Sequence, residues 1–395
     1  MPNRQIALIL LALILTACSH TKSPSITPVG ELLKRRGDEI MVAGQLFHTN
    51  APVVLWTDPG GFDAYRTDRR FAPYKQASFN ATTQQATEIE AQTGKKAKFA
   101  DIDSPNRLDL RAAVLTDEEI AKFRGGGWDL ESLQQKVDQF VIHFDVAGTA
   151  SNCFNILHDV RGLSVHFMLD VDGTIYQTCD VKERAFQATV ANPRSVGIEI
   201  ANIGAYEPTD PEHTLDTWYR KDDTGKPRLI LPAWVRKTDL KGGPGPYYPA
   251  RDERISGNIQ GHDLEMYDLT PQQYDSLVKL TAALCTALPK ITCDYPRDGE
   301  GKLIPRALDG PTWYDYQGLV GHYHVQTNKT DPGPAFQWDK VRDGAWALMS
   351  NSAKAANLAA RGQPVHFKNP PTTWPEHWGL RSPWGATTQP GSKKE

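Results

Sequence analysis

Short apolar runs and polar stretches alternate irregularly over the first third of the chain, and the pattern becomes regular from about residue 136. Residues 139–144 form an apolar run typical of a buried strand, and residues 150–160 are expected to form a helix. Residues 164–177 have the pattern of a β-hairpin, for which Asp172-Gly173 predicts a type I′ turn. Residues 195–201 predict another strand. Strands interleaved with helices indicate an α/β fold.

The second half of the chain continues this alternation after an interruption. Residues 206–258 are rich in proline, glycine and charge, and we expect them to be an insertion. Thr270-Pro271 supplies the N-cap and first residue of a helix that reaches about residue 285. A strand is expected at 319–322 and a helix from 339 to about 360. The tail that follows is expected to be irregular.

The region before residue 136 predicts structure but no chemistry. Residues 39–43 and 52–56 have the composition of strands, and the second of these is closed by a turn at 58–61. Thr116, with Glu119 three residues later, predicts the start of a helix. We assign no catalytic or binding residue to this region.

The first residues predict export and a lipid anchor. One arginine, an apolar run at 6–15 and small residues before Cys18 are typical of a secretory signal over 1–17. The run is shorter than the roughly 20 residues that cross a bilayer. Residues 15–18 also resemble a bacterial lipobox, which implies acylation of Cys18, and Ser19 would imply sorting to the outer membrane, facing the periplasm. An ordinary signal peptide with an incidental cysteine is the alternative.

Charge and cysteine content indicate which partners to expect and whether the cysteines form disulfides. The formal net charge is −3, which gives no support for binding nucleic acid. Contact with the membrane is expected only through the lipid anchor at Cys18. Four cysteines remain besides Cys18, an even number that fits disulfides in an exported protein. Three pairings are possible, and Cys285 with Cys293, which are close in sequence, is our first choice.

Three residues at the ends of predicted elements have the chemistry of a catalytic zinc site. Such a site takes three ligands from imidazoles and carboxylates and leaves a fourth position for water. His143 and His322 each end an apolar strand, and Asp331 lies in a Thr-Asp-Pro-Gly turn nine residues after His322. A histidine alone in a strand is more often part of a packed core, so spacing alone leaves both interpretations open.

The segments 141–145, 196–200 and 321–338, in this order, resemble the zinc-dependent N-acetylmuramoyl-L-alanine amidase family, which AmpD-type enzymes, phage amidases and peptidoglycan recognition proteins share. The most specific match is Gly-His at 321–322 followed by Lys-Thr-Asp-Pro-Gly-Pro-Ala-Phe-Gln-Trp at 329–338. The resemblance covers roughly 136–345 and implies a central mixed β-sheet flanked by helices, with an N-terminal extension and the insertion. Together with the signal and lipobox pattern, it divides the chain into a signal peptide (1–17), a lipidated tether (18–30), an extension (31–135), the amidase domain (136–345) and a C-terminal helix with an irregular tail (346–395).

The resemblance implies a role for each of five residues. His143, His322 and Asp331 would hold one Zn²⁺ per chain. Glu199 would be the general base, and Lys329 would stabilise the charge that develops on the carbonyl oxygen. The implied substrate is the amide between the lactyl group of N-acetylmuramic acid and L-alanine in peptidoglycan or muropeptides.

Departures from the family pattern concern the surroundings of the site. Gln187 stands where many members have a histidine, and Asn328 where an arginine often precedes the lysine. Gln187, Asn328 and His166 are each expected either to contact substrate or to support the metal ligands from behind. A structural role is a further alternative for His166. His324, two residues after His322, competes with it as a ligand if both lie on one strand.

Two other functions compete with amidase activity. Recognition proteins of this fold usually lose a zinc ligand, whereas this chain keeps all three, which argues against a non-catalytic module that only binds peptidoglycan. A zinc peptidase acting on the stem peptide is a further alternative, although no HExxH motif occurs.

Overall fold

The computed structural model describes residues 29–65, 79–95, 108–124, 127–231 and 240–368. The predicted signal peptide, Cys18 and nearly all of the tether lie outside the described residues, as does the tail from 369 onward. The chain divides into two units, Met1–Arg35 and Arg36–Glu395. Residues 29–35 of the first unit contain no helix or strand. None of the helices in the described ranges has the length and apolar character needed to cross a bilayer.

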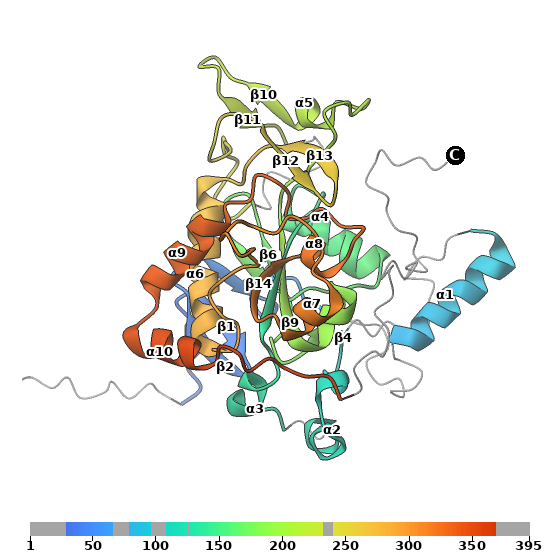
Figure 1. The fold of residues 1–395 in the computed structure, drawn as a ribbon, viewed down its shortest axis with the longest axis vertical. Helices are drawn as coiled ribbons and strands as arrows, with labels where there is room; N and C mark the ends of the chain where they lie inside the picture. Colours follow the sequence, from blue (N-terminus) through green and yellow to red (C-terminus); the bar gives the residue numbers. More distant parts are fainter. Residues whose placement is uncertain (1–28, 66–78, 96–107, 125–126, 232–239, 369–395) are drawn as a thin grey trace, which may run out of the picture. The chain divides into compact units, whose positions relative to one another are not determined.

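A six-stranded mixed sheet organises the second unit (Figure 1). Its strands, in spatial order, are β14 (Gly318–Gly321), β5 (Gln139–Phe144), β9 (Ser195–Ile200), β6 (Phe167–Leu169), β7 (Ile175–Gln177) and β3 (Val53–Leu55). Only β6 and β7 pair in antiparallel fashion; the other neighbours are parallel. The predicted fold class, a central mixed sheet flanked by helices, is confirmed.

Alternation along the strands separates two faces of the sheet. On β5, Phe140 and Ile142 enter the largest hydrophobic cluster, together with Val196 and Ile198 of β9. The helices of this face are α6 (Pro271–Ala287), α9 (Trp338–Leu348) and α10 (Asn351–Ala359), which lie side by side in Figure 1. Because side chains alternate along a strand, His143 and Glu199 lie on the opposite face.

The opposite face is covered by two smaller clusters. One joins Met168 of β6 to α4 (Ala150–Phe154), which continues as the π-helical segment η3 (Asn155–Val160). The other joins Val141 and Val320 to η4 (Thr189–Arg194) and α7 (Gly310–Asp315). These elements therefore cover the sheet face that carries His143 and Glu199 on both sides of the two residues.

The N-terminal extension belongs to the same unit from Arg36 onward. It supplies the edge strand β3, the hairpin of β1 (Glu39–Val42) and β2 (Gln45–His48), and β4 (Leu108–Asp109), which pairs with β8 (Arg184–Ala185). Its remaining elements are α1 (Phe79–Thr93), η2 (Ala112–Val114), α2 (Asp117–Arg124) and α3 (Leu130–Gln134). The predicted strands at 39–43 and 52–56 and the Thr116 cap, whose Oγ1 accepts the N–H of Glu119, are confirmed.

The segment expected to be an insertion contains short local structure. It holds α5 (Thr214–Trp218), a hairpin of β10 (Tyr219–Lys221) and β11 (Pro227–Leu229), and the strand β12 (Ile255–Ile259), which pairs with β13 (His262–Met266). Leu264 and Met266 of β13 enter the large core. The second hairpin is thus packed onto the sheet unit.

Three local predictions differ from the structure. The turn between β6 and β7 is not type I′, which needs positive φ at both central residues; only Gly173 has positive φ, 86°, and its N–H donates to Asp170 O. The predicted strand at 319–322 ends at Gly321, because His322 begins the helical turn α8 (His322–Val325).

The third difference concerns the expected disulfide. The four cysteines of the described ranges are free, including Cys285 and Cys293. The two thiols interact in the core, and the influence of Cys293, together with burial, raises the pKa of Cys285 well above its usual value. The predicted proximity is therefore present without the covalent bond.

Candidate metal centre and active site

Strand geometry brings His143 and Glu199 together. β5 and β9 are parallel, and their register places His143 directly opposite Glu199. Side chains that are opposite each other on neighbouring strands project from the same face. The pair lies at the carboxyl end of β5 and β9, the edge at which open α/β sheets present their functional groups.

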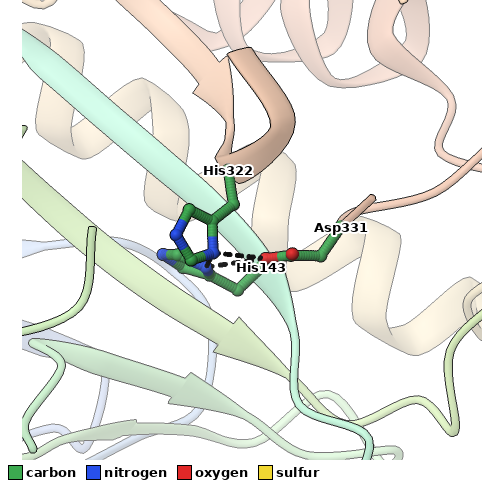
Figure 2. A group of neighbouring side chains, drawn as sticks. All are labelled: His143, His322 and Asp331. Carbon is green, nitrogen blue, oxygen red and sulfur yellow. Dashed lines mark hydrogen bonds and ion pairs between the residues drawn. The ribbon is translucent and has the colours of Figure 1, made fainter. Parts of the chain in front are cut away.

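Three side chains from separate segments converge on one point above this face (Figure 2). His143 Nδ1 lies 2.9 Å from His322 Nδ1 and 2.8 Å from Asp331 Oδ2, and His322 Nδ1 lies 3.0 Å from the same carboxylate oxygen. All three residues are buried. β5 carries His143, the start of α8 carries His322, and the loop before α9 carries Asp331.

Two glutamines determine which nitrogen of each histidine faces the other ligands. His143 Nε2 lies 2.5 Å from Gln187 Oε1, and His322 Nε2 lies 2.7 Å from Gln326 Oε1. An amide oxygen only accepts, so each Nε2 carries the proton and each Nδ1 presents a lone pair. A histidine that ligates a metal usually donates its other N–H to such a partner.

The arrangement therefore fits a metal ion. Two imidazole lone pairs and a carboxylate oxygen face one another within 3.0 Å, and none of these atoms has a proton to share if both Nε2 atoms are protonated. A tetrahedral ion with bonds of about 2.0–2.1 Å would hold its ligand atoms at similar separations, slightly above 3 Å. The donor set of two histidines and one carboxylate is one that catalytic Zn²⁺ uses, with the fourth position left for water.

A second group of possible ligands in the described residues, Asp38, Glu39 and His48, lacks this character. The Glu39 carboxylate already accepts the main-chain N–H groups of Arg36 and Gly37. His48 is exposed and bonds Asp38. The buried group at His143 is thus the better candidate for a metal.

Charge and burial tune the groups around the centre. Burial lowers the pKa of His322 to about 4. For His143, burial also lowers the pKa, but the negative charges of Glu199 and Asp331 outweigh it and raise the value overall. Burial raises the pKa of the Asp331 carboxyl, but the two histidines outweigh it and hold that pKa well below its usual range.

Glu199 is the acid beside this centre. Its side chain is nearly buried, with 9% of the residue exposed. Burial raises its pKa to about 7. Protonation of His143 would oppose this rise, the Asp331 carboxylate adds to it, and Arg161 and Lys329 oppose it. A carboxylate in this environment is suited to exchange protons near neutral pH.

The other predicted residues lie around the three candidate ligands. Asn328 is exposed and its Oδ1 lies 3.4 Å from Gln326 Nε2. Lys329 is half-buried and its charge acts on both Glu199 and His322. Gln187 contacts His143 itself and therefore orients the imidazole, which places it among the residues that support the candidate ligands.

Two other histidines that were candidates for the site form hydrogen bonds with main-chain groups outside it. His324 Nδ1 accepts the N–H of Gly321, and its Nε2 donates to Ile304 O, so neither ring nitrogen faces the cluster. His166 is fully buried and its Nδ1 accepts the N–H of Gly197 on β9. His166 therefore supports the strand that carries Glu199.

Gln326 and Arg111 are the residues that sequence reasoning missed. Gln326 lies four positions after His322, so on the helical turn α8 the two share a face. That signal was hidden by the prediction of a strand. Arg111 lies in the extension, and its long-range contacts leave no local pattern.

Comparison with known proteins points to one family. Residues 133–221 match the model of the N-acetylmuramoyl-L-alanine amidase family. This range contains His143, Gln187 and Glu199, whereas His322 and Asp331 lie beyond it. The match supports membership of this family and suggests an amidase-type hydrolase. No curated protein matches the chain in sequence.

Solved structures give only remote likenesses. The amidase AmiD from E. coli, in complex with an anhydro-N-acetylmuramic acid tripeptide, is 16% identical over 54% of this chain and 58% of its own, with a TM-score of 0.28. AmpDh3 from Pseudomonas aeruginosa is 15% identical over 54% and 61%, with a TM-score of 0.30. The amidase LysC from Clostridium intestinale is 14% identical over 55% and 89%, with a TM-score of 0.27. This chain thus spans less than two thirds of AmiD and of AmpDh3.

Proposed function

We propose that this chain is a zinc-dependent N-acetylmuramoyl-L-alanine amidase, which hydrolyses the amide between the lactyl group of N-acetylmuramic acid and L-alanine in peptidoglycan or muropeptides. One observation carries the proposal: three buried ligand atoms lie within 3.0 Å of one another while both histidines give their remaining N–H to glutamines. The family match of residues 133–221 supports the choice of this bond.

His143, His322 and Asp331 would hold the ion through Nδ1, Nδ1 and Oδ2. Bound there, Zn²⁺ would lower the pKa of a coordinated water toward about 7 and polarise the substrate carbonyl. An aspartate ligand donates less charge to the ion than a thiolate would, so the bound ion would be the stronger Lewis acid. Gln187 and Gln326 keep the imidazoles in the required tautomer and orientation.

Glu199 and Lys329 would handle the proton and the developing charge. As the water oxygen bonds to the lactyl carbonyl carbon, Glu199 would accept the proton that the water releases. When the carbon–nitrogen bond breaks, the same carboxyl would give that proton to the alanine nitrogen. The Lys329 ammonium would stabilise the negative charge on the carbonyl oxygen.

A module that only binds peptidoglycan is the alternative function. It needs neither a complete ligand set nor a carboxylate with a raised pKa beside it, and the described residues include both. The test compares wild-type protein with Glu199→Gln, each loaded with zinc, on purified sacculi and on soluble anhydromuropeptides. Peptide released only by the wild type supports the amidase, and stoichiometric zinc without release by either protein favours the binding module.

We also propose that the protein is exported and held in the cell envelope by acylation of Cys18, on the basis of the signal and lipobox pattern of the first residues. A tether from the membrane would keep the site beside the cell wall. Labelling with a clickable fatty acid in a Gram-negative host tests this anchor. Label on the wild type but not on Cys18→Ser supports it, and equal labelling contradicts it.

A further inference from the structure

We propose that Arg111, in the N-terminal extension, is a positioning residue for the metal centre that acts through Asn192 and Gln187 on His143. The inference rests on the proposed metal site. It gives a function to a part of the chain in which the sequence indicates no chemistry.

The Arg111 guanidinium is fully buried in a ring of main-chain carbonyl groups. Its Nη2 lies 2.8 Å from one carbonyl oxygen and 2.7 Å from another, and its Nη1 lies between 3.0 and 3.2 Å from three more. Nε reaches a sixth at 3.3 Å. The six carbonyl groups belong to Val181, Lys182, Glu183, Asn192, Pro193 and Ser195.

The six carbonyl groups lie at the two ends of one loop. Three directly precede β8, and three close η4 or open β9. The guanidinium therefore ties together the two ends of the segment 181–195. Without it, these buried carbonyl groups would lose their shared donor, which is costly for a backbone group without another partner. Glu183 O alone is also within reach of the Nε2–H of His166, at 3.0 Å.

The middle of this loop reaches the metal centre in two steps. The side chain of Asn192, whose main-chain oxygen accepts from Arg111, takes the N–H groups of Gln187 at 3.1 Å and Ala188 at 2.7 Å on its Oδ1. Gln187 Oε1 then accepts the Nε2–H of His143 at 2.5 Å. One chain of contacts thus links Arg111 to the imidazole whose Nδ1 faces the other ligands.

Gln187 has little freedom to find another position. Its Nε2 donates to Ser195 Oγ at 2.9 Å, and the residue is packed over Gly197, where an added Cβ would lie 2.6 Å from Gln187 Cδ. The extension also holds the loop directly, because β4 pairs with β8 two residues before Gln187. A change at Arg111 is therefore expected to be transmitted to His143 rather than absorbed in the loop.

A conservative pair of variants separates positioning from general stability. Arg111→Lys keeps the charge but offers three donors from one atom instead of a planar fork. Asn192→Ala leaves Arg111 intact and removes the acceptor for Gln187. Asn357→Ala is the matched control: Asn357 is also fully buried and bonds the carbonyl groups of Pro289 and Ile291, far from the metal residues in sequence and on the α6 side of the sheet.

The experiment measures the dissociation constants of Zn²⁺ and Co²⁺ by chelator competition, the visible spectrum of the Co²⁺ form and the melting temperature, all on the full mature chain. We expect Arg111→Lys and Asn192→Ala each to weaken metal binding by about tenfold and to shift the Co²⁺ spectrum. The double variant should be no weaker than about the worse single one, because both act through one chain of contacts. Asn357→Ala should lower the melting temperature and leave affinity and spectrum unchanged.

Unchanged affinity and spectrum in Arg111→Lys and Asn192→Ala, whatever their melting temperatures, would overturn the inference. The same holds if Asn357→Ala weakens metal binding as much as they do. If Arg111→Lys does not fold, Asn192→Ala alone decides. A wild-type protein that binds no zinc refutes the proposed metal site instead, and one that binds zinc without hydrolysing muropeptide refutes the amidase while leaving the inference testable.

Discussion

His143 and Glu199 lie directly opposite each other on the parallel strands β5 and β9, at the carboxyl end of both. One side chain presents a nitrogen to the candidate metal position, and the other is an acid whose pKa burial raises to about 7. The pairing of the two strands therefore fixes the separation between the candidate ligand and the proposed base.

The first prediction concerns Glu199 as the base. Glu199→Gln keeps the shape of the side chain and should lower kcat by about 10²- to 10⁴-fold, the usual contribution of a general base. Zinc content should stay at one per chain, because Glu199 is not a ligand. Metal analysis beside the rate measurement tests both halves, and near-normal turnover by the variant would refute the role.

The pH dependence of the wild type gives a second test of the same carboxylate. The base works only when ionised, so kcat/KM should rise with pH through the pKa of Glu199. That pKa is about 7 without an ion, and a bound cation would lower it, so the rise should be centred below pH 7. The Glu199→Gln variant should lack this limb. A wild-type profile that is flat from pH 5 to 8 would contradict the assignment.

The two glutamines should control metal affinity. Gln187→Ala and Gln326→Ala each remove the acceptor that fixes one imidazole, and each should weaken zinc binding by about 10- to 100-fold. Gln363→Ala, which removes an exposed side-chain amide that donates to Ala359 O, is a control expected to bind zinc normally. Titration against a chelating dye measures all three. Wild-type affinity in both glutamine variants would show that the contacts do not orient the ligands.

Gly197 on β9 should not tolerate a methyl group. A Cβ there would come within 2.6 Å of Gln187 Cδ, so Gly197→Ala must displace Gln187 from His143. We expect a loss of stability of about 1–3 kcal/mol, as for overpacked cores, and weaker zinc binding in the same direction as Gln187→Ala. Gly225→Ala has open space around its Cβ but a positive φ, and it should cost stability without affecting zinc.

Zinc should stabilise the folded chain. Three ligand atoms with lone pairs face one another within 3.0 Å, and a cation bound only by the folded state adds about 2.7 kcal/mol at a free concentration of 100 times its Kd. Chelation should therefore lower the melting temperature by several degrees, reversibly. In Asp331→Asn, zinc should have much less effect. Equal melting temperatures with and without zinc would contradict the site.

The sequence predicted the parts of the site that lie on regular elements. His143 and Glu199 lie on strands whose apolar pattern is unambiguous, and His322 and Asp331 lie in a motif of known order. The choice between His322 and His324 could not come from periodicity, because the chain turns into α8 at His322 and directs His324 toward Gly321 and Ile304.

Contacts between distant segments could not be predicted in this way. Arg111 bonds carbonyl groups 70 to 84 residues away, and β4 has only two residues, so neither leaves a periodic signal. The sequence left open whether Gln187 contacts substrate or supports a ligand, whereas in the structure its amide oxygen accepts the Nε2–H of the candidate ligand His143. Cys285 and Cys293 were correctly predicted to be neighbours, but proximity in sequence does not determine whether the bond forms.

Mass analysis of the products tests the central claim most directly. Zinc-loaded wild-type protein is incubated with a defined N-acetylmuramoyl peptide, beside metal-stripped protein and Glu199→Gln. The account predicts two products from the wild type alone: a peptide with a free N-terminal alanine and a muramic acid with a free lactyl carboxyl, together one water heavier than the substrate. Cleavage between amino acids, cleavage that survives removal of the metal, or no cleavage by protein that holds one zinc per chain would contradict it.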